Sequence, residues 1–347
     1  MKVDLMTGGL PLRDMQQLAR DASAAGFSGL VITEAGRTAY LSCAAAALAA
    51  EIDLLSGIAV AFPRSPMVTA AVAWELADVS SGRFRLGLGT QVRAHVERRY
   101  GSEFDPPGPR MRDYVGALRA IFAAYRGTDD LDYDGEFWKL SLLPAMWSPG
   151  PIAVPDPPID IAAVNPWMLE MAGEVADGVH VHPLNTPVYL DQSVLPNLRT
   201  GSAKVGRSAA DLELIVPSFA APGSTSEEVN QWREMARMQV AFYGSTPNYA
   251  FIFDQLGRPG TTERIRAKQK AGDIAGMAAV VDDELLDEFC ISGDWADVVD
   301  RLSNRYRNVA TRVVLYFAGM AWARDRTALG RWGELALALR AVSPPTG

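Results

Sequence analysis

The segment from Gly57 to Thr90 constrains the fold more than any other part of the 347-residue chain. It holds two apolar runs of strand length, separated by a stretch in which Val68, Val72 and Leu76 recur at helical spacing. Parallel strands need a crossover connection of about a dozen residues or more, which is usually a helix. The segment therefore predicts a parallel β-α-β unit and places the chain in the α/β class.

Eight segments in total have the near-continuous apolar character of strands that are buried on both faces. They are Val3–Met6, Gly29–Thr33, Leu54–Phe62, Phe84–Gly89, Ile159–Val164, Asp177–His182, Leu212–Ala220 and Arg312–Ala318. Helical patterns separate them, and this alternation predicts a single (β/α)8 TIM barrel domain over residues 1–347. The chain is about 100 residues longer than the typical ~250 for this fold. The excess predicts insertions after strands 4 and 7.

Five helices are predicted between the first six strands. They span Leu12–Ala25, Tyr40–Ala50, Met67–Val79, Arg112–Tyr125 and Trp167–Val175. Gly26 follows the first of them, where a left-handed cap residue belongs. The insertions are expected to contain a small hairpin around Leu131–Leu140 and helices over Trp232–Tyr243 and Asp294–Tyr306.

Charge and composition narrow the range of partners. The formal net charge is −8 and no basic run occurs, which argues against nucleic acid or an anionic membrane as partner. No apolar run approaches the roughly 18 residues of a membrane helix, and the N-terminus lacks the pattern of a signal peptide. Two distant cysteines indicate neither a disulfide framework nor a thiolate metal site. We expect a cytoplasmic protein.

The fourth predicted strand ends in a glycine-rich sequence, Gly87-Leu88-Gly89-Thr90. It begins like a dinucleotide-binding fingerprint, but Val92 stands where the third glycine belongs and no helix starts at the required place. This weakens the rival architecture, a doubly wound open sheet. At the carboxyl end of a barrel strand, Gly89 and Thr90 would face the active-site mouth, whereas Gly87 fits tight packing inside the barrel.

Several short motifs together resemble a known family. They are A-F-P-R-S-P at 61–66, S-S-G-R-F at 80–84, L-G-L-G-T at 86–90 and A-D-G-V-H-V-H at 176–182. The chain thereby resembles the luciferase-like monooxygenase superfamily, and within it the oxidoreductases that depend on coenzyme F420. The resemblance implies hydride transfer between F420 and a small-molecule substrate, and it implies a homodimer. The alternatives are an FMN-dependent monooxygenase and, from another class, a non-catalytic F420-binding or carrier protein.

The resemblance also assigns cofactor contacts on strands two to four. Thr90 matches a cofactor-binding threonine of the family, and His95 falls where the family carries an asparagine. Glu34, at the end of strand two, would bond the cofactor's ring edge or hydroxyls. A non-proline cis peptide of the family would fall at Ala59–Val60, behind the ring of the cofactor.

The turn after strand five is assigned to the phosphate or side chain of the cofactor. There the strand runs into Val164, Asn165 and Trp167 at the start of a helix. Such a helix start offers free N–H groups and the positive end of the helix dipole. The resemblance implies that these three residues contribute mainly through their backbone.

Strand six ends with two histidines on one face, His180 and His182, because side chains alternate along a strand. A zinc site would need three or four ligands, and His95 is the one remaining histidine, so no metal is expected. His182, nearer the mouth, is predicted to contact the substrate or to act as a general acid, since an imidazole exchanges protons near neutrality. The aromatic segment 242–249 is a candidate to close over a flat ligand.

Two positions depart from the sugar-phosphate dehydrogenases of the group. These enzymes have a histidine directly after the acid that matches Glu34, where this chain has Ala35. They have a glutamate two positions after the matching threonine, where this chain has Val92. Both family residues are thought to serve in acid–base catalysis, so that mechanism and substrate are not transferred to this chain.

Overall fold

The computed structural model describes residues 1–342, and its centre is a closed barrel of eight parallel strands. In barrel order these are β1 (Lys2–Thr7), β2 (Gly29–Ile32), β3 (Asp53–Ser56), β5 (Phe84–Gly89), β8 (Ile159–Ala163), β9 (Gly178–Val181), β10 (Glu213–Pro222) and β12 (Arg312–Leu315). The barrel closes because β12 pairs with β1, where Lys2 is the register partner of Arg312. The predicted (β/α)8 barrel is confirmed.

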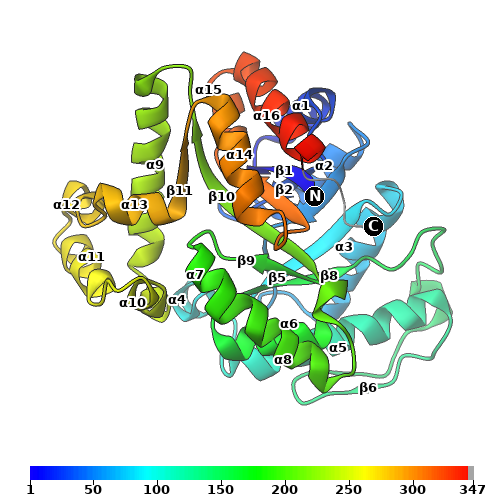
Figure 1. Ribbon diagram of the computed structural model, residues 1–347. Coiled ribbons are helices and arrows are strands. Elements are labelled where there is room, and N and C mark those ends of the chain that lie inside the picture. Colours follow the sequence, from blue (N-terminus) through cyan, green and yellow to red (C-terminus); the bar gives the residue numbers. More distant parts are fainter. Residues whose placement is uncertain (343–347) are drawn as a thin grey trace.

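Helices cover the outside of the barrel (Figure 1). They include α1 (Leu12–Ala25), α2 (Ala39–Ala47), α3 (Pro66–Val79), α5 (Pro107–Arg126), α6 (Pro166–Val175), α8 (Leu195–Lys204), α14 (Trp295–Tyr306), α15 (Ala318–Arg324) and α16 (Leu329–Val342). Helix α1 has its predicted bounds, and Gly26 caps it with the left-handed φ of 93°. Pro66 and Pro166 occupy first-turn positions of α3 and α6, where the missing N–H of proline has no helical partner to lose.

Both predicted insertions are present. After β5 the chain forms α4 (Arg93–Arg98), and after α5 it forms the hairpin of β6 (Tyr133–Asp134) and β7 (Lys139–Leu140). The second insertion contains α9 (Ser226–Gly244), η4 (Pro247–Tyr249), α10 (Ala250–Gln255), α11 (Thr261–Lys270), α12 (Ile274–Ala279), α13 (Asp283–Phe289) and β11 (Cys290–Gly293). Its helices project together at the left of Figure 1. Strand β11 pairs with the last four residues of β10, beyond the part of β10 that pairs with β9 and β12.

The inside of the barrel is layered from its amino end to its mouth. The amino end holds a buried ionic group, in which Arg312 pairs with Asp4 and Asp53, and Arg85 pairs with Asp160. Above it lies an apolar layer of one residue from each of five strands: Met6, Val31, Leu55, Ile215 and Val314. These side chains alternate with outward residues that pack against the helices, as the two-residue period of a strand requires.

The third predicted strand is not continuous. It consists of β3 and a two-residue strand β4 (Ala59–Val60). Leu54 pairs with Phe84, but Ala59 pairs with Leu88, so this side of the ladder carries one extra residue. Such an extra residue is a β-bulge, and it interrupts the ladder.

The predicted place of the cis peptide was wrong by two residues. The non-proline cis bond joins Gly57 and Ile58, and not Ala59 and Val60. The prediction was transferred from the family, by register from the S-S-G-R-F motif. Because the bulge falls before β4, the residues at 59–60 have already returned to the ladder with β5.

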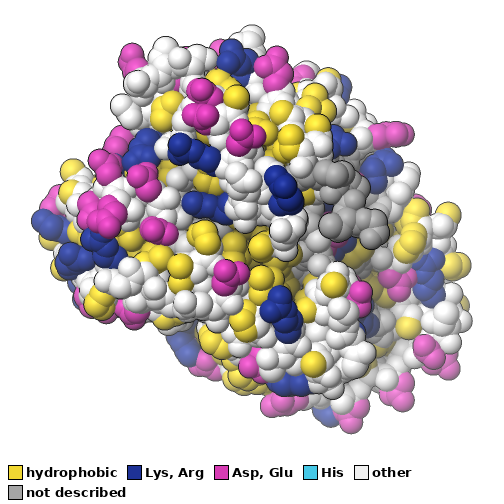
Figure 2. All heavy atoms as spheres, in the orientation of Figure 1, with side chains coloured by type: hydrophobic (Ala, Val, Ile, Leu, Met, Phe, Trp, Pro, Cys, Tyr) yellow, Lys and Arg dark blue, Asp and Glu magenta, His cyan; other side chains and the backbone are white. Residues whose placement is uncertain are grey.

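Charges of both signs are interspersed on the face of the molecule shown in Figure 2. A hydrophobic strip separates the region of α14 from that of α7 (Pro187–Tyr189) and α8 on the same face. Within the described residues, no helix combines the length and the apolar character that crossing a membrane requires.

Candidate active site at the barrel mouth

The carboxyl ends of the strands bring most of the predicted site residues to one end of the barrel, as the fold dictates. Gly57, Gly87 and Gly89 give this end its shape on the side of β3 and β5. A Cβ added to Gly87 would lie 1.9 Å from the backbone oxygen of Ser56, so tight packing explains Gly87, as predicted. A Cβ added to Gly89 would meet the side chain of Ile58 at 2.7 Å. The glycines therefore let the bulge lie directly against β5.

Glu34 lies at the mouth, but its carboxylate is already engaged. Its two oxygens accept from both terminal nitrogens of Arg64, at 2.9 and 2.5 Å, and one of them also accepts the backbone N–H of Val60 at 2.8 Å. The Glu34 side chain is 3% exposed. The structure thus joins Glu34 to Val60, and both to Arg64, which was not among the predicted site residues.

Thr90 follows β5 directly and is half-buried, with its hydroxyl donating to the carbonyl of Gln91 at 3.1 Å. Gln91 adopts a left-handed φ of 59°, which turns the chain sharply away from the barrel. His95 consequently lies on α4, where its side chain is exposed. Thr90 is therefore at the mouth, whereas His95 lies on a helix beside it.

The turn after β8 has the predicted form. The Asn165 side chain caps α6 by accepting the N–H of Met168 at 3.0 Å. The carbonyl of Val164 accepts the hydroxyl of Tyr189 at 2.8 Å. The Trp167 ring turns outward onto α5, where a Cβ on Gly108 would lie 2.2 Å from it. Trp167 can therefore offer its backbone to a ligand, and its side chain packs elsewhere.

His182 lies at the end of β9 between two aromatic rings from the second insertion. Its ring centroid is 4.9 Å from that of Tyr243 and 4.3 Å from that of Tyr249. The aromatic segment 242–249 thus reaches the mouth through these two tyrosines, while Phe242 is exposed. The Nδ1 atom of His182 accepts the N–H of Leu184 at 3.0 Å, which places the imidazole proton on Nε2.

The protonation of His182 differs from the expectation. Burial among these groups lowers its pKa to about 3, so the ring is neutral at pH 7 and does not exchange a proton near neutrality. The imidazolium needed for general acid catalysis is therefore not formed at that pH. A neutral imidazole with its proton on Nε2 is instead a hydrogen-bond donor, the other role predicted for His182.

Next to His182, the hydroxyl groups of two tyrosines are joined to each other. The hydroxyl oxygens of Tyr243 and Tyr316 are 2.7 Å apart, and Tyr316 donates to Gln239 Oε1 at 3.3 Å. Burial raises the pKa of Tyr249 to about 12 and raises the pKa of Tyr243. These phenols remain neutral at pH 7, so this side of the mouth presents uncharged polar groups.

His180 lies one layer deeper and is buried between two of the glycines. A Cβ on Gly87 would lie 2.5 Å from its Nε2, and a Cβ on Gly57 would lie 3.4 Å from its Cε1. The Nε2 atom is buried and has no hydrogen-bond partner within residues 1–342. Burial, reinforced by the charges of Arg85 and Arg312, lowers the pKa of His180 to about 3.

This shift predicts how acid affects stability. The unfolded chain binds a proton at His180 near pH 6.5, whereas the folded chain binds it only near pH 3, so stability falls as the pH drops between these values. We expect His180→Met to reduce the slope of unfolding free energy against pH by up to about 1.4 kcal/mol per pH unit around pH 4.5. Denaturant unfolding of both proteins from pH 4 to pH 7 measures this. Equal slopes would show that His180 titrates alike in the two states.

The two departures from the sugar-phosphate dehydrogenases also lie at the mouth. Ala35 offers only its carbonyl, which accepts from Arg99 at 2.5 Å. Val92 is the N-cap residue of α4 and is partly exposed. Neither residue has a side chain that transfers protons.

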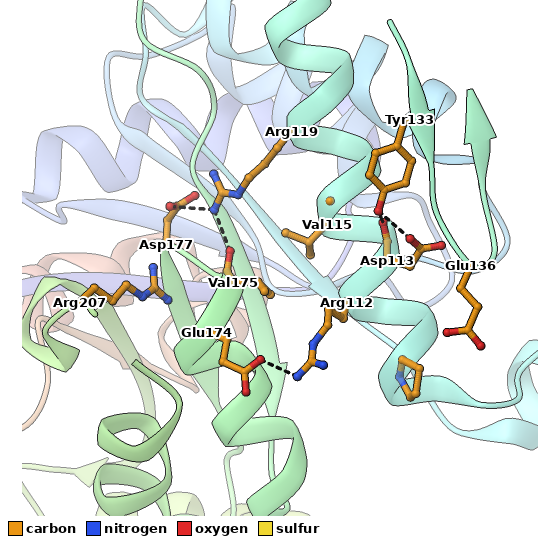
Figure 3. A pocket seen from close by; sticks show the side chains of 12 residues that line it. Arg112, Asp113, Val115, Arg119, Tyr133, Glu136, Glu174, Val175, Asp177 and Arg207 are labelled. Carbon is orange, nitrogen blue, oxygen red and sulfur yellow. Dashed lines mark hydrogen bonds and ion pairs between the residues drawn. The ribbon is translucent and has the colours of Figure 1, made fainter. Parts of the chain in front are cut away.

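A separate cavity of about 700 Å³ lies on the outer side of the barrel, between α5, the end of α6 and the β6–β7 hairpin (Figure 3). Two ion pairs lie in its lining: Arg112 with Glu174 at 2.5 Å and Arg119 with Asp177 at 3.0 Å. Asp177 precedes β9, so this part of the lining lies at the amino end of that strand, outside the barrel. It is not part of the mouth.

The fold is a (β/α)8 barrel. Its mouth combines a bulged third strand, a neutral histidine and the helices of the second insertion, which is an arrangement typical of enzymes with this fold. The chain matches the luciferase-like monooxygenase model over residues 2–312 and belongs to that family. An uncharacterised protein of Mycobacterium tuberculosis (strain ATCC 25618 / H37Rv) is 37% identical over 319 residues, which cover 90% of this chain and 93% of that protein.

Two further relatives carry functional names. The 5,10-methylenetetrahydromethanopterin reductase of Archaeoglobus fulgidus is 31% identical over 276 residues, or 76% of each chain. The solved structure of the coenzyme F420 dependent tetrahydromethanopterin reductase from Methanopyrus kandleri superposes with a TM-score of 0.80 at 22% identity, covering 97% of this chain and 98% of that one. At 22% identity, the match to the Methanopyrus kandleri structure shows that the two proteins share a fold.

Proposed function

We propose that this protein is an oxidoreductase that transfers a hydride between coenzyme F420 and a small organic substrate. The observation that carries the proposal is the mouth itself, where a bulged third strand and a neutral donor, His182, lie at the same end of the barrel, in a chain 31% identical to a 5,10-methylenetetrahydromethanopterin reductase. When bound, the deazaflavin would supply the carbon that gives or accepts the hydride.

The residues present fit such a cofactor. Ala59 and Val60 are small or aliphatic, and the charge of Glu34 is balanced by Arg64, so no unpaired charge faces a flat ring there. Thr90 has a hydroxyl whose lone pairs can accept a hydrogen bond. The first N–H groups of a helix have no helical acceptor, so at the start of α6 the amide of Trp167 could bind an anionic group, while the Asn165 side chain takes the amide of Met168.

The remaining residues suit the substrate. Nε2–H of His182 would hold a carbonyl oxygen or an imine nitrogen in place, as a neutral histidine can in polarising a substrate. Tyr243 and Tyr249 flank that donor and would exclude water from it. Ala35 and Val92 have apolar side chains that cannot transfer protons. The proposed reaction would therefore depend on hydride transfer and would use no acid–base pair at these two positions.

A pair of titrations tests the proposal. Purified protein is titrated with F420 and, separately, with FMN, while cofactor fluorescence is followed. We expect F420 to bind at least about 10-fold more tightly than FMN, which corresponds to about 1.4 kcal/mol. Oxidation of reduced F420 is then followed with 5,10-methylenetetrahydromethanopterin as the first acceptor, because a relative is named for it.

The other outcomes identify the alternatives. A preference for FMN, with oxygen consumption by the reduced complex, would make the protein a flavin-dependent monooxygenase of the same family. Stoichiometric F420 binding without turnover across a broad set of acceptors would make it a non-catalytic F420-binding or carrier protein. Binding of neither cofactor would contradict the proposal.

A further inference from the structure

The side chains of Glu34 and Arg64 form hydrogen bonds with both backbone polar groups of Val60, which lies on the bulged strand. The carboxylate of Glu34 accepts the N–H of Val60 at 2.8 Å, and the guanidinium of Arg64 donates to the C=O of Val60 at 2.9 Å. The two side chains are joined by two hydrogen bonds of 2.9 and 2.5 Å. We call this arrangement the Glu34–Arg64 clamp.

Arg64 is itself held on several sides. Its guanidinium carbon lies 5.0 Å from the centre of the buried Tyr40 ring, a cation–π distance. Its backbone N–H donates to Ala61 at 3.0 Å, and its carbonyl accepts from the hydroxyl of Tyr114 at 3.2 Å. The clamp is thus attached to the rigid outer core and can transmit its position to Val60.

The strand needs such support because its ladder is broken just before Val60. Between the pairs Leu55–Arg85 and Ala59–Leu88, three residues on one side face two on the other. Ser56 fills part of the gap with its hydroxyl, which donates to the carbonyl and accepts the N–H of Gly87, both at 2.9 Å. On the edge of β4 that faces away from β5, the clamp forms hydrogen bonds with the N–H and C=O of Val60 and so holds this strand after the bulge.

We propose that the Glu34–Arg64 clamp is a positioning pair, which fixes Val60 and the bulge so that this strand presents a flat, uncharged wall to the cofactor. The inference rests on the proposed function, because the wall is the one assigned to the cofactor ring. It gives Glu34 a role through Val60, and it adds Arg64 to the site.

The test compares the clamp with a similar ion pair at the far end of the barrel. Arg64→Met and Glu34→Met remove the clamp, and Arg64→Lys keeps the charge but loses the two-nitrogen geometry. Arg85→Met is the matched control, because Arg85 makes an equally short, two-nitrogen pair with the buried Asp160. Should that control not fold, Lys2→Met removes the Lys2–Asp53 pair at the same end.

Two readouts are used, and neither is activity. Hydrogen exchange of segment 57–64 reports the clamp without cofactor, and fluorescence titration with F420 gives the dissociation constant. We expect both clamp variants to exchange this segment faster and to bind F420 at least about 10-fold more weakly, with Arg64→Lys between them and the wild type. The control variant is expected to have a lower melting temperature than the wild type. Its dissociation constant for F420 is expected to stay within about 2-fold of the wild-type value.

The possible failures can be told apart. Unchanged exchange in segment 57–64, or unchanged F420 affinity in both clamp variants, would overturn the positioning role while the proposed function stands. Equal weakening by the control would also overturn it, because the effect would then follow global stability. If the wild type itself does not bind F420, the proposed function and this inference both fail.

Discussion

Replacing His182 with phenylalanine is expected to lower kcat/KM for the proposed hydride transfer by about 100-fold or more, the usual cost of removing a preorganised hydrogen-bond donor. Phenylalanine keeps a ring between Tyr243 and Tyr249, so the aromatic packing is retained. What is lost is the Nε2–H donor that the Leu184 N–H fixes by occupying Nδ1. The rate of oxidation of reduced F420 by a substrate measures the effect, and F420 affinity is measured alongside.

The pH profile gives an independent check on His182. Because burial lowers its pKa to about 3, the wild-type rate is expected to show no ionisation near pH 6.5 that the variant lacks. Tyr125→Phe is the control, since its hydroxyl contacts Met67 on the outer side of the barrel. A kinetic pKa near 6.5 that disappears in the variant would show that His182 acts as a charged acid. A rate within about 2-fold of the wild type would remove it from the mechanism.

Replacing Arg312 with methionine is expected to cost about 3–5 kcal/mol of folding stability, as does breaking a buried ion pair from one side. The guanidinium makes two bonds of 2.7 Å to Asp4 and one of 2.9 Å to Asp53, and both Arg312 and Asp4 are buried. Methionine would leave the buried Asp4 without its partner at the amino end of the barrel, and loss of the guanidinium would raise the pKa of this carboxyl further above its usual value. Denaturant unfolding at pH 7 measures the loss.

A second variant separates the lost ion pair from lost packing. Arg312→Met combined with Asp4→Asn is expected to be more stable than the single variant, because it removes the buried carboxyl, which would otherwise stay charged without a partner or have to take up a proton. Lys268→Met is the exposed control and is expected to change stability little, since surface pairs such as Lys268–Asp273 contribute little. A single variant as stable as that control would contradict the account.

The sequence was sufficient to predict elements in which periodicity and local signals agree. The bounds of α1 and β5 were predicted as observed, and the cap at Gly26 was placed correctly. The β6–β7 hairpin also lies in its predicted segment. By contrast, the helices α10–α13 were missed, because they are short and their few buried residues do not make a clear periodic stripe.

The position of a site residue could be predicted only where that residue directly follows a barrel strand. Thr90 and His182 follow their strands directly, so their places follow from the fold. The partner of Glu34 could not be deduced, because Arg64 lies 30 residues away in a loop whose path depends on the bulge. The neutrality of His182 also required the structure, since it comes from Tyr243 and Tyr249, which are distant in sequence.

The long strand β10 has a consequence for how proteins of this architecture can diverge. Pro222 at its end is the register partner of Gly293 in β11, the last strand of the second insertion, so the segment 223–292 begins and ends beside paired positions on adjacent strands about 4.8 Å apart. A segment with adjacent ends can be exchanged for that of a relative without displacing the strands on either side. Tyr243 and Tyr249 belong to this segment, whereas Glu34, Val60, Arg64 and Thr90 do not. The part of the mouth that Tyr243 and Tyr249 supply can therefore evolve, or be grafted, as one module, while His182 and the residues around the bulged strand stay on the barrel.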